Sequence, residues 1–232
     1  MAKLHPQPSK EQLAASSLYG GLMGEALIRI AAIDHGTMNK SGLIAPFVQE
    51  FCYLQLRKIC ELMALGCLVA HGEIEGTSGM HTQWSADKII KRLSNLHEDF
   101  FPLLMQIQLD PQGHNTMTHA KGGMTKEDML QVYYECDKYL HSGSLKKLLK
   151  KKTPLRVNYP EITARAQRFR SLVESHTVVM KGGENLFICY LKGPDELQVA
   201  IAKTMDEPPL ELGSGFYMRG PDFSAKKQRR DG

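Results

Sequence analysis

The sequence lacks the short motifs that mark the best-known catalytic and cofactor sites. It contains no Gly-rich phosphate-binding loop, no GxSxG nucleophile elbow, no HExxH zinc motif and no CxxC pair. Its nine histidines and five cysteines show no spacing typical of a zinc framework. We therefore expect no metal and no cofactor, and any site must consist of ordinary side chains that the fold brings together.

Segments that direct a chain into a membrane are also missing. No stretch reaches the ~18 uncharged apolar residues that a membrane span needs. A signal peptide has an apolar run after its charged start, and the first twelve residues are not followed by such a run. An odd number of cysteines without a secretory framework is typical of a reducing compartment. We therefore expect a cytoplasmic protein that does not contact membranes.

The composition is that of an ordinary globular protein, with 232 residues, of which 42% are hydrophobic and 23% are charged. Apolar residues recur every three to five positions in several segments, which predicts helices. Ser9 can cap the first of them, and Thr125 with Asp128 resembles a capping box at the fourth. The predicted helices cover residues 9–33, 43–72, 85–98, 125–140 and 161–174.

The pattern changes after His176, where short apolar and β-branched runs are separated by the turn sequences KGGEN and GPDE. Thr177–Met180, Leu186–Lys192 and Leu197–Thr204 are predicted to be the three strands of a meander. Residues 110–124, which are rich in Gly and polar side chains, are expected to form a loop.

These elements predict a mainly α fold with an α+β organisation. We expect a bundle of five or six helices over residues 1–175. A small three-stranded antiparallel sheet over residues 176–207 should pack on it, because three strands alone are marginally stable. Residues 208–232 have little apolar content and are expected to form a mobile basic tail.

The helix at 43–72 is apolar on nearly every side but carries one charged row. Glu50, Arg57 and Glu61 fall within about 20° of a common line on the helix surface. Burying charge without a partner is costly. The row therefore indicates either a structural ion pair network that joins helices or an arginine that binds a phosphate or carboxylate ligand.

A second candidate lies in the predicted helix 125–140, where Tyr134, Asp137 and His141 share one face. A histidine beside a carboxylate can act as a general acid or base. It can equally cap the C-terminus of its helix, where the helix dipole favours a positive charge. If the two helices pack together, Arg57, Glu61, Tyr134 and His141 form one candidate catalytic cleft.

The net charge of +4 is unevenly distributed along the chain. Residues 138–170 hold ten basic side chains and one acidic one, whereas the segments before and after are net negative. Such a block indicates either a solvated helix face or a site for a polyanion, with sequence-independent phosphate contacts. Its proposed contact residues are Lys146, Lys147, Lys150, Lys151, Lys152, Arg156, Arg165, Arg168 and Arg170.

Three segments, FVQEFCYLQLRKICELMALGCLVAHG, EDFFPLL and MTKEDMLQVYYECDKYLHSGS, resemble a family of uncharacterised bacterial helical proteins. More distantly, the helical part is similar to the HEPN superfamily, which includes abortive-infection and toxin ribonucleases. Its signature is an Arg followed by His after four to six residues, and Arg92–His97 and Arg170–His176 match it. Chance supplies about one such match in this composition, so ribonuclease activity is not carried over.

Three functions follow as hypotheses. The first is a bacterial protein associated with nucleic acid, in defence or stress, that uses the basic block. The second is an enzyme or small-ligand protein built on the Arg57 cleft. The third is a homo-oligomeric interaction module that uses the sheet edge or the Gly-rich face of the first helix.

Nucleic-acid binding by the basic block makes a quantitative prediction. If about six phosphates are contacted, the affinity for a DNA duplex should fall about a thousandfold between about 50 and 200 mM salt, because bound counterions are released. Fluorescence anisotropy with a labelled duplex measures this. An affinity that stays constant over that range would contradict the hypothesis.

Overall fold

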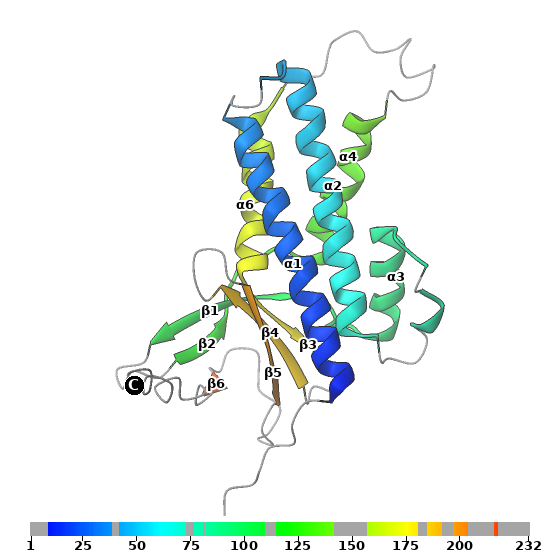
Figure 1. Ribbon diagram of the computed structural model, residues 1–232, viewed down its shortest axis with the longest axis vertical. Helices are drawn as coiled ribbons and strands as arrows, with labels where there is room; N and C mark the ends of the chain where they lie inside the picture. Colours follow the sequence, from blue (N-terminus) through cyan, green and yellow to red (C-terminus); the bar gives the residue numbers. More distant parts are fainter. Residues whose placement is uncertain are drawn as a thin grey trace, which may run out of the picture.

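The computed structural model describes residues 9–38, 42–72, 77–80, 82–109, 115–141, 157–180, 185–191, 197–203 and 216–217. In these residues the chain forms five α-helices and one six-stranded antiparallel sheet. The helices stand together above the sheet, which lies at one end of the molecule (Figure 1). The predicted mainly helical α+β fold is confirmed.

Helices α1 (Lys10–Thr37) and α2 (Ala45–Ala70) are the two longest and pack side by side (Figure 1). Ser9 starts α1 as predicted, because its hydroxyl accepts the Gln12 N–H at 3.2 Å while the Gln12 side chain accepts the Ser9 N–H at 2.9 Å. The helices approach closely at Gly66. A Cβ there would lie 2.8 Å from the terminal methyl of Met23.

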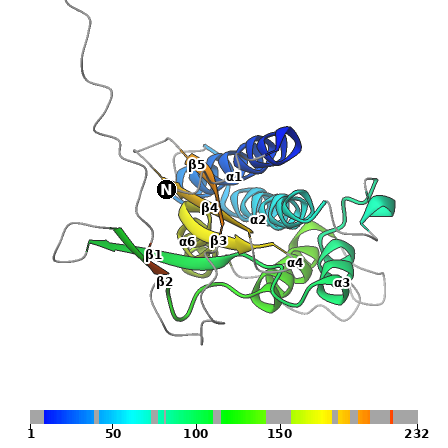
Figure 2. The same cartoon turned by 90° about the horizontal axis from the view of Figure 1, so that it is seen from below.

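The remaining helices are α3 (Ala86–Leu96), α4 (Lys126–Leu140) and α6 (Tyr159–Glu174), with a short 3-10 helix at Ser78–Met80. Seen from below, α1 and α2 lie together on one side of the molecule and α6, α4 and α3 on the other (Figure 2). The outward side of the α1–α2 pair therefore has no helix packed on it among the described elements.

The sheet has the strand order β5-β4-β3-β1-β2-β6. Its members are β1 (Leu103–Leu109), β2 (Asn115–His119), β3 (Ser175–Val179), β4 (Asn185–Leu191), β5 (Leu197–Lys203) and β6 (Phe216–Tyr217). The predicted meander is confirmed as β3, β4 and β5, with Ile188 of β4 paired with Thr177 on one side and Ala200 on the other.

Three further strands correct the expectation of a three-stranded sheet. Residues 115–119 were expected to lie in a loop, but they form β2 and pair with β1. Phe216 and Tyr217 in the expected tail form β6 against β2, while the other residues of 208–232 lie outside the described parts. The signal for the hairpin was present, since alternating LLMQIQL is followed by the turn sequence DPQG.

A buried hydrogen bond joins the helices to the sheet. The Tyr19 hydroxyl of α1 donates to Nε2 of His176 in β3 at 2.6 Å, and Nδ1 of His176 donates to the Leu172 carbonyl at 2.7 Å. Tyr19 also packs edge-on against Phe187 of β4. Both Tyr19 and His176 are inaccessible to solvent. Burial lowers the pKa of His176 to about 4, so its imidazole is neutral at pH 7.

His71, at the end of α2, is equally buried, and its Nε2 lies 3.1 Å from the Phe100 carbonyl. Burial lowers the pKa of His71 to about 4 as well.

These two histidines predict acid sensitivity. Between about pH 6.5 and pH 4 the unfolded chain binds protons that the folded protein excludes, so the free energy of unfolding should fall as the pH drops through that window. Each histidine contributes up to roughly 3 kcal/mol to this loss. Urea unfolding from pH 7 to pH 4.5 measures the slope.

The slope should become shallower in H176Q and, independently, in H71Q. H35Q, which alters an exposed histidine in the last turn of α1, serves as the control. An unchanged slope in both buried-site variants would show that neither imidazole is neutral in the folded state.

Candidate functional site

Arg57 of α2 holds α4 by several contacts. Its Nη1 forms an ion pair with Asp137, and its Nη2 donates to the Tyr133 hydroxyl at 3.1 Å. The guanidinium carbon lies 4.5 Å from the centroid of the Tyr133 ring. Its Nε lies 3.5 Å from the carboxylate of Glu61, one turn along α2. These contacts occupy the guanidinium with groups of the protein itself.

The predicted row is therefore only partly right. Glu61 is buried and also accepts a hydrogen bond from Lys58 Nζ at 2.8 Å, whereas Glu50 is exposed and does not reach Arg57. The second carboxylate at the guanidinium is Asp137 instead. The arrangement fits the structural interpretation, because Arg57 ties α2 to α4.

His141 takes the position of the C-cap of α4, and its backbone N–H bonds to the Asp137 carbonyl at 3.3 Å. Its ring is exposed and lies 3.8 Å from the Asp137 carboxylate. Through Asp137, His141 stands at the edge of the Arg57 cluster.

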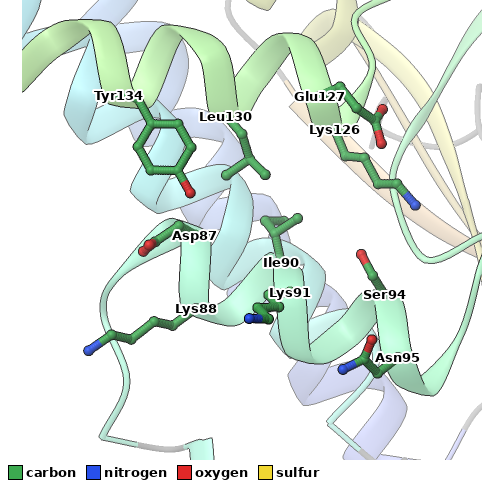
Figure 3. A pocket seen from close by; sticks show the side chains of 10 residues that line it. All are labelled: Asp87, Lys88, Ile90, Lys91, Ser94, Asn95, Lys126, Glu127, Leu130 and Tyr134. Carbon is green, nitrogen blue, oxygen red and sulfur yellow. The ribbon is translucent and has the colours of Figure 1, made fainter.

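Tyr134 does not join this cluster. It is half exposed and lies in a groove between α3 and α4, where it points toward Asp87 while Leu130 faces Ile90 (Figure 3). The tyrosine at Arg57 is its neighbour Tyr133. The four candidate residues therefore do not form one cleft.

The three proposed contact residues of the basic block that the structure describes are already paired with carboxylates. Arg165 pairs with Glu135 and Glu161, Arg168 pairs with Asp128, and Arg170 pairs with Asp34 and Glu174. These three arginines hold α6 against α1 and α4, which leaves them poorly placed to bind phosphates. The other six proposed contacts lie outside the described residues. They are Lys146, Lys147, Lys150, Lys151, Lys152 and Arg156.

The two histidines of the HEPN-like pattern, His97 and His176, occupy structural positions. His176 is buried against Tyr19. Arg170 forms ion pairs with Asp34 of α1 and Glu174 of its own helix. His97 lies at the end of α3, with Nε2 3.0 Å from the Val179 carbonyl. Neither histidine lines a groove in the described part of the chain.

The most unusual surface is the outward side of α1 and α2. Seven large apolar side chains are exposed there, with Ile28 at 71%, Ile44 at 64% and Phe47 at 56% of their full accessibility. We call this surface the α1–α2 face. Its members are Ile28, Met38, Leu43, Ile44, Phe47, Phe51 and Leu54. Several large apolar side chains exposed in one region make this face a candidate interaction site.

Sequence reasoning did not find this face, although its signal was visible. Phe47, Phe51 and Leu54 recur at the four- and three-residue spacing of one helix side. Because α2 is apolar nearly all round, its periodicity could not show which side faces water. The burial of Cys52, Leu56 and other residues on the opposite side shows it.

Comparison with known proteins adds no assignment. The sequence matches no family model, and no curated protein or solved structure is significantly similar to it. The HEPN resemblance therefore rests on the sequence pattern alone. Among the described residues, no helix has the length and apolar character of a membrane span. The same residues contain no cluster of three or more potential metal ligands.

Replacing Arg57 tests the structural role of its cluster. R57M should lower the free energy of unfolding by about 2 kcal/mol, because Glu61 stays buried with only Lys58 as a partner. If Arg57 served only a ligand, R57M would change the free energy of unfolding little. R57M/E61M should recover at least half of the loss, since both charges are then gone. K58M, at a half-exposed position, is the control and should cost less than about 1 kcal/mol.

Proposed function

We propose that this protein is a homo-oligomeric interaction module whose copies associate through the α1–α2 face. The observation that supports the proposal is a group of seven exposed apolar side chains, four on the helices α1 and α2 and three in the segment that joins them. Fully burying one Phe or Leu side chain stabilises by about 1.5–3 kcal/mol. The seven side chains are 36–71% exposed, so a partner that covers them gains part of this energy from each.

The shape of the face suits a helical partner. A helix of 26 residues such as α2 is about 39 Å long, which gives an elongated contact surface. On α1, Gly21 and Gly24 have open space where a side chain would project, and they lie on the same side of the helix as Ile28. Glycines at these positions let a second helix approach the α1 backbone closely.

The sheet edge is a less favourable surface for self-association. β5 is the terminal strand in the observed order, so its outer backbone groups could pair with another chain. However, α1 already packs on this strand, and a Cβ added at Gly20 would lie 3.4 Å from Cγ2 of Val199. The apolar side chains that need a cover are on α1 and α2 instead.

Nucleic-acid association remains a second proposal, supported by the seven basic side chains within residues 138–170 that remain besides the paired Arg165, Arg168 and Arg170. Self-association would place two such blocks on one particle, and clustering of positive charge strengthens attraction to polyanions. We also propose a reducing, cytoplasmic setting, which the five buried and unpaired cysteines support.

Multi-angle light scattering over a concentration series tests the proposed self-association. The wild-type protein should show a mass of at least two chains. F47E and I28E should each raise the dissociation constant at least about tenfold, since an unpaired carboxylate would be buried in the contact.

L13E is the matched control. Leu13 is as exposed as Phe47 and lies on α1, about 22 Å along the helix from Ile28. Its substitution should leave the mass unchanged. A single-chain mass for the wild type at every concentration would rule the proposal out.

A further inference from the structure

We infer that the copies associate as a two-fold dimer in which α2 packs against α2 of the second copy beside Leu54. The two helices then run in opposite directions, and Glu50 of each copy lies next to Lys58 of the other. This inference rests on the proposed self-association and specifies its geometry.

The first support is the arrangement of side chains on α2. Glu50, Leu54 and Lys58 follow each other at intervals of four residues, so they form one ridge on the exposed side of the helix. Phe47 and Phe51 form the neighbouring ridge. In the commonest class of helix packing, ridges of this spacing fit into the grooves between the same ridges of a second helix, at a crossing angle of about −50°. Between these two ridges on α2 lie the apolar side chains of Phe47, Phe51 and Leu54, with Glu50 and Lys58 at the two ends of one ridge.

The second support is charge. A two-fold axis can bring the two ridges together in either of two directions. In one, Glu50 meets Glu50 and Lys58 meets Lys58, which places like charges beside each other. In the other, each Glu50 meets a Lys58 of the second copy on either side of a Leu54–Leu54 contact. Opposite charges attract and like charges repel at such distances, so the charges select the second direction.

The ionic contacts of Lys58 and Glu50 within one copy fit this choice. Lys58 is half exposed and already bonds to Glu61 of its own helix, so its ammonium group would bridge Glu61 and the incoming Glu50. Glu50 is exposed and has no ion pair with any of the described residues. The second copy would supply that pair, while Ile28 on α1 would flank the contact.

Charge reversal tests the predicted pairing. E50K and K58E should each raise the dimer dissociation constant about tenfold, because each places like charges across the axis. The double variant E50K/K58E restores opposite charges and should return the constant to within about threefold of wild type. K138E, on the outer side of α4, is the control. Thermal unfolding checks that K58E remains folded without its bond to Glu61.

Disulfide cross-linking provides a second measurement. All five native cysteines are buried, and burial raises their thiol pKa, for example to about 11 for Cys52, so they react slowly. A cysteine at the two-fold axis should lie next to the same cysteine of the second copy. A disulfide can then form, since it needs the two Cα atoms to lie within about 7 Å of each other. L54C should therefore form a covalent dimer under mild oxidation, whereas L13C, at the opposite end of α1, should not.

The outcomes separate the two proposals. A dimer whose stability ignores both charge reversals, or that cross-links no better through L54C than through L13C, overturns the antiparallel α2 contact but leaves self-association in place. A wild-type protein that stays a single chain overturns both. The α1–α2 face would then have to bind a different protein or a lipid surface.

Discussion

The fold depends on the contact between Tyr19 and His176. Tyr19 lies where α1, α2 and the sheet meet, since it contacts His176 of β3 and Phe187 of β4 and lies close to Gly66 of α2. A buried hydroxyl and a buried imidazole are costly unless each has a partner, and here they satisfy each other. This requirement fixes the rotation of α1 about its axis. One side of α1 is committed to the core, and Ile28 is therefore turned outward.

Most of the described arginines that the sequence indicated as candidate site residues join helices to one another. Arg57 links α2 to α4 through Asp137, and Arg168 links α6 to the start of α4 through Asp128. Arg170 links α6 to α1 through Asp34. Because these arginines are satisfied within the protein, they offer little to a ligand. The feature that the fold leaves exposed is apolar, and this is why we propose association between proteins rather than catalysis.

An element could be predicted well when residues close to it in the sequence determine it. The starts of α1 and α4 were predictable, because their capping boxes lie within four residues of chain. Strands β3 to β5 were predictable as well, since short turns join neighbouring runs. β1 is different, because it bridges β2 to β3, and β3 lies about seventy residues further along the chain. Its alternating pattern is brief and follows Pro102, so the local signal was weak.

The candidate site shows the same limit. Periodicity placed Glu50, Arg57 and Glu61 on one line, but it could not show that Asp137 would take the place of Glu50 at the guanidinium. The partner of Arg57 depends on how α2 packs against α4, where Asp137 lies eighty residues further along the chain. By itself, then, the sequence determined the helices, their caps and the meander, because propensity, capping and turn chemistry act between neighbouring residues. Only the tertiary structure decided which charges are paired and which side of α2 faces water, because burial depends on every element at once.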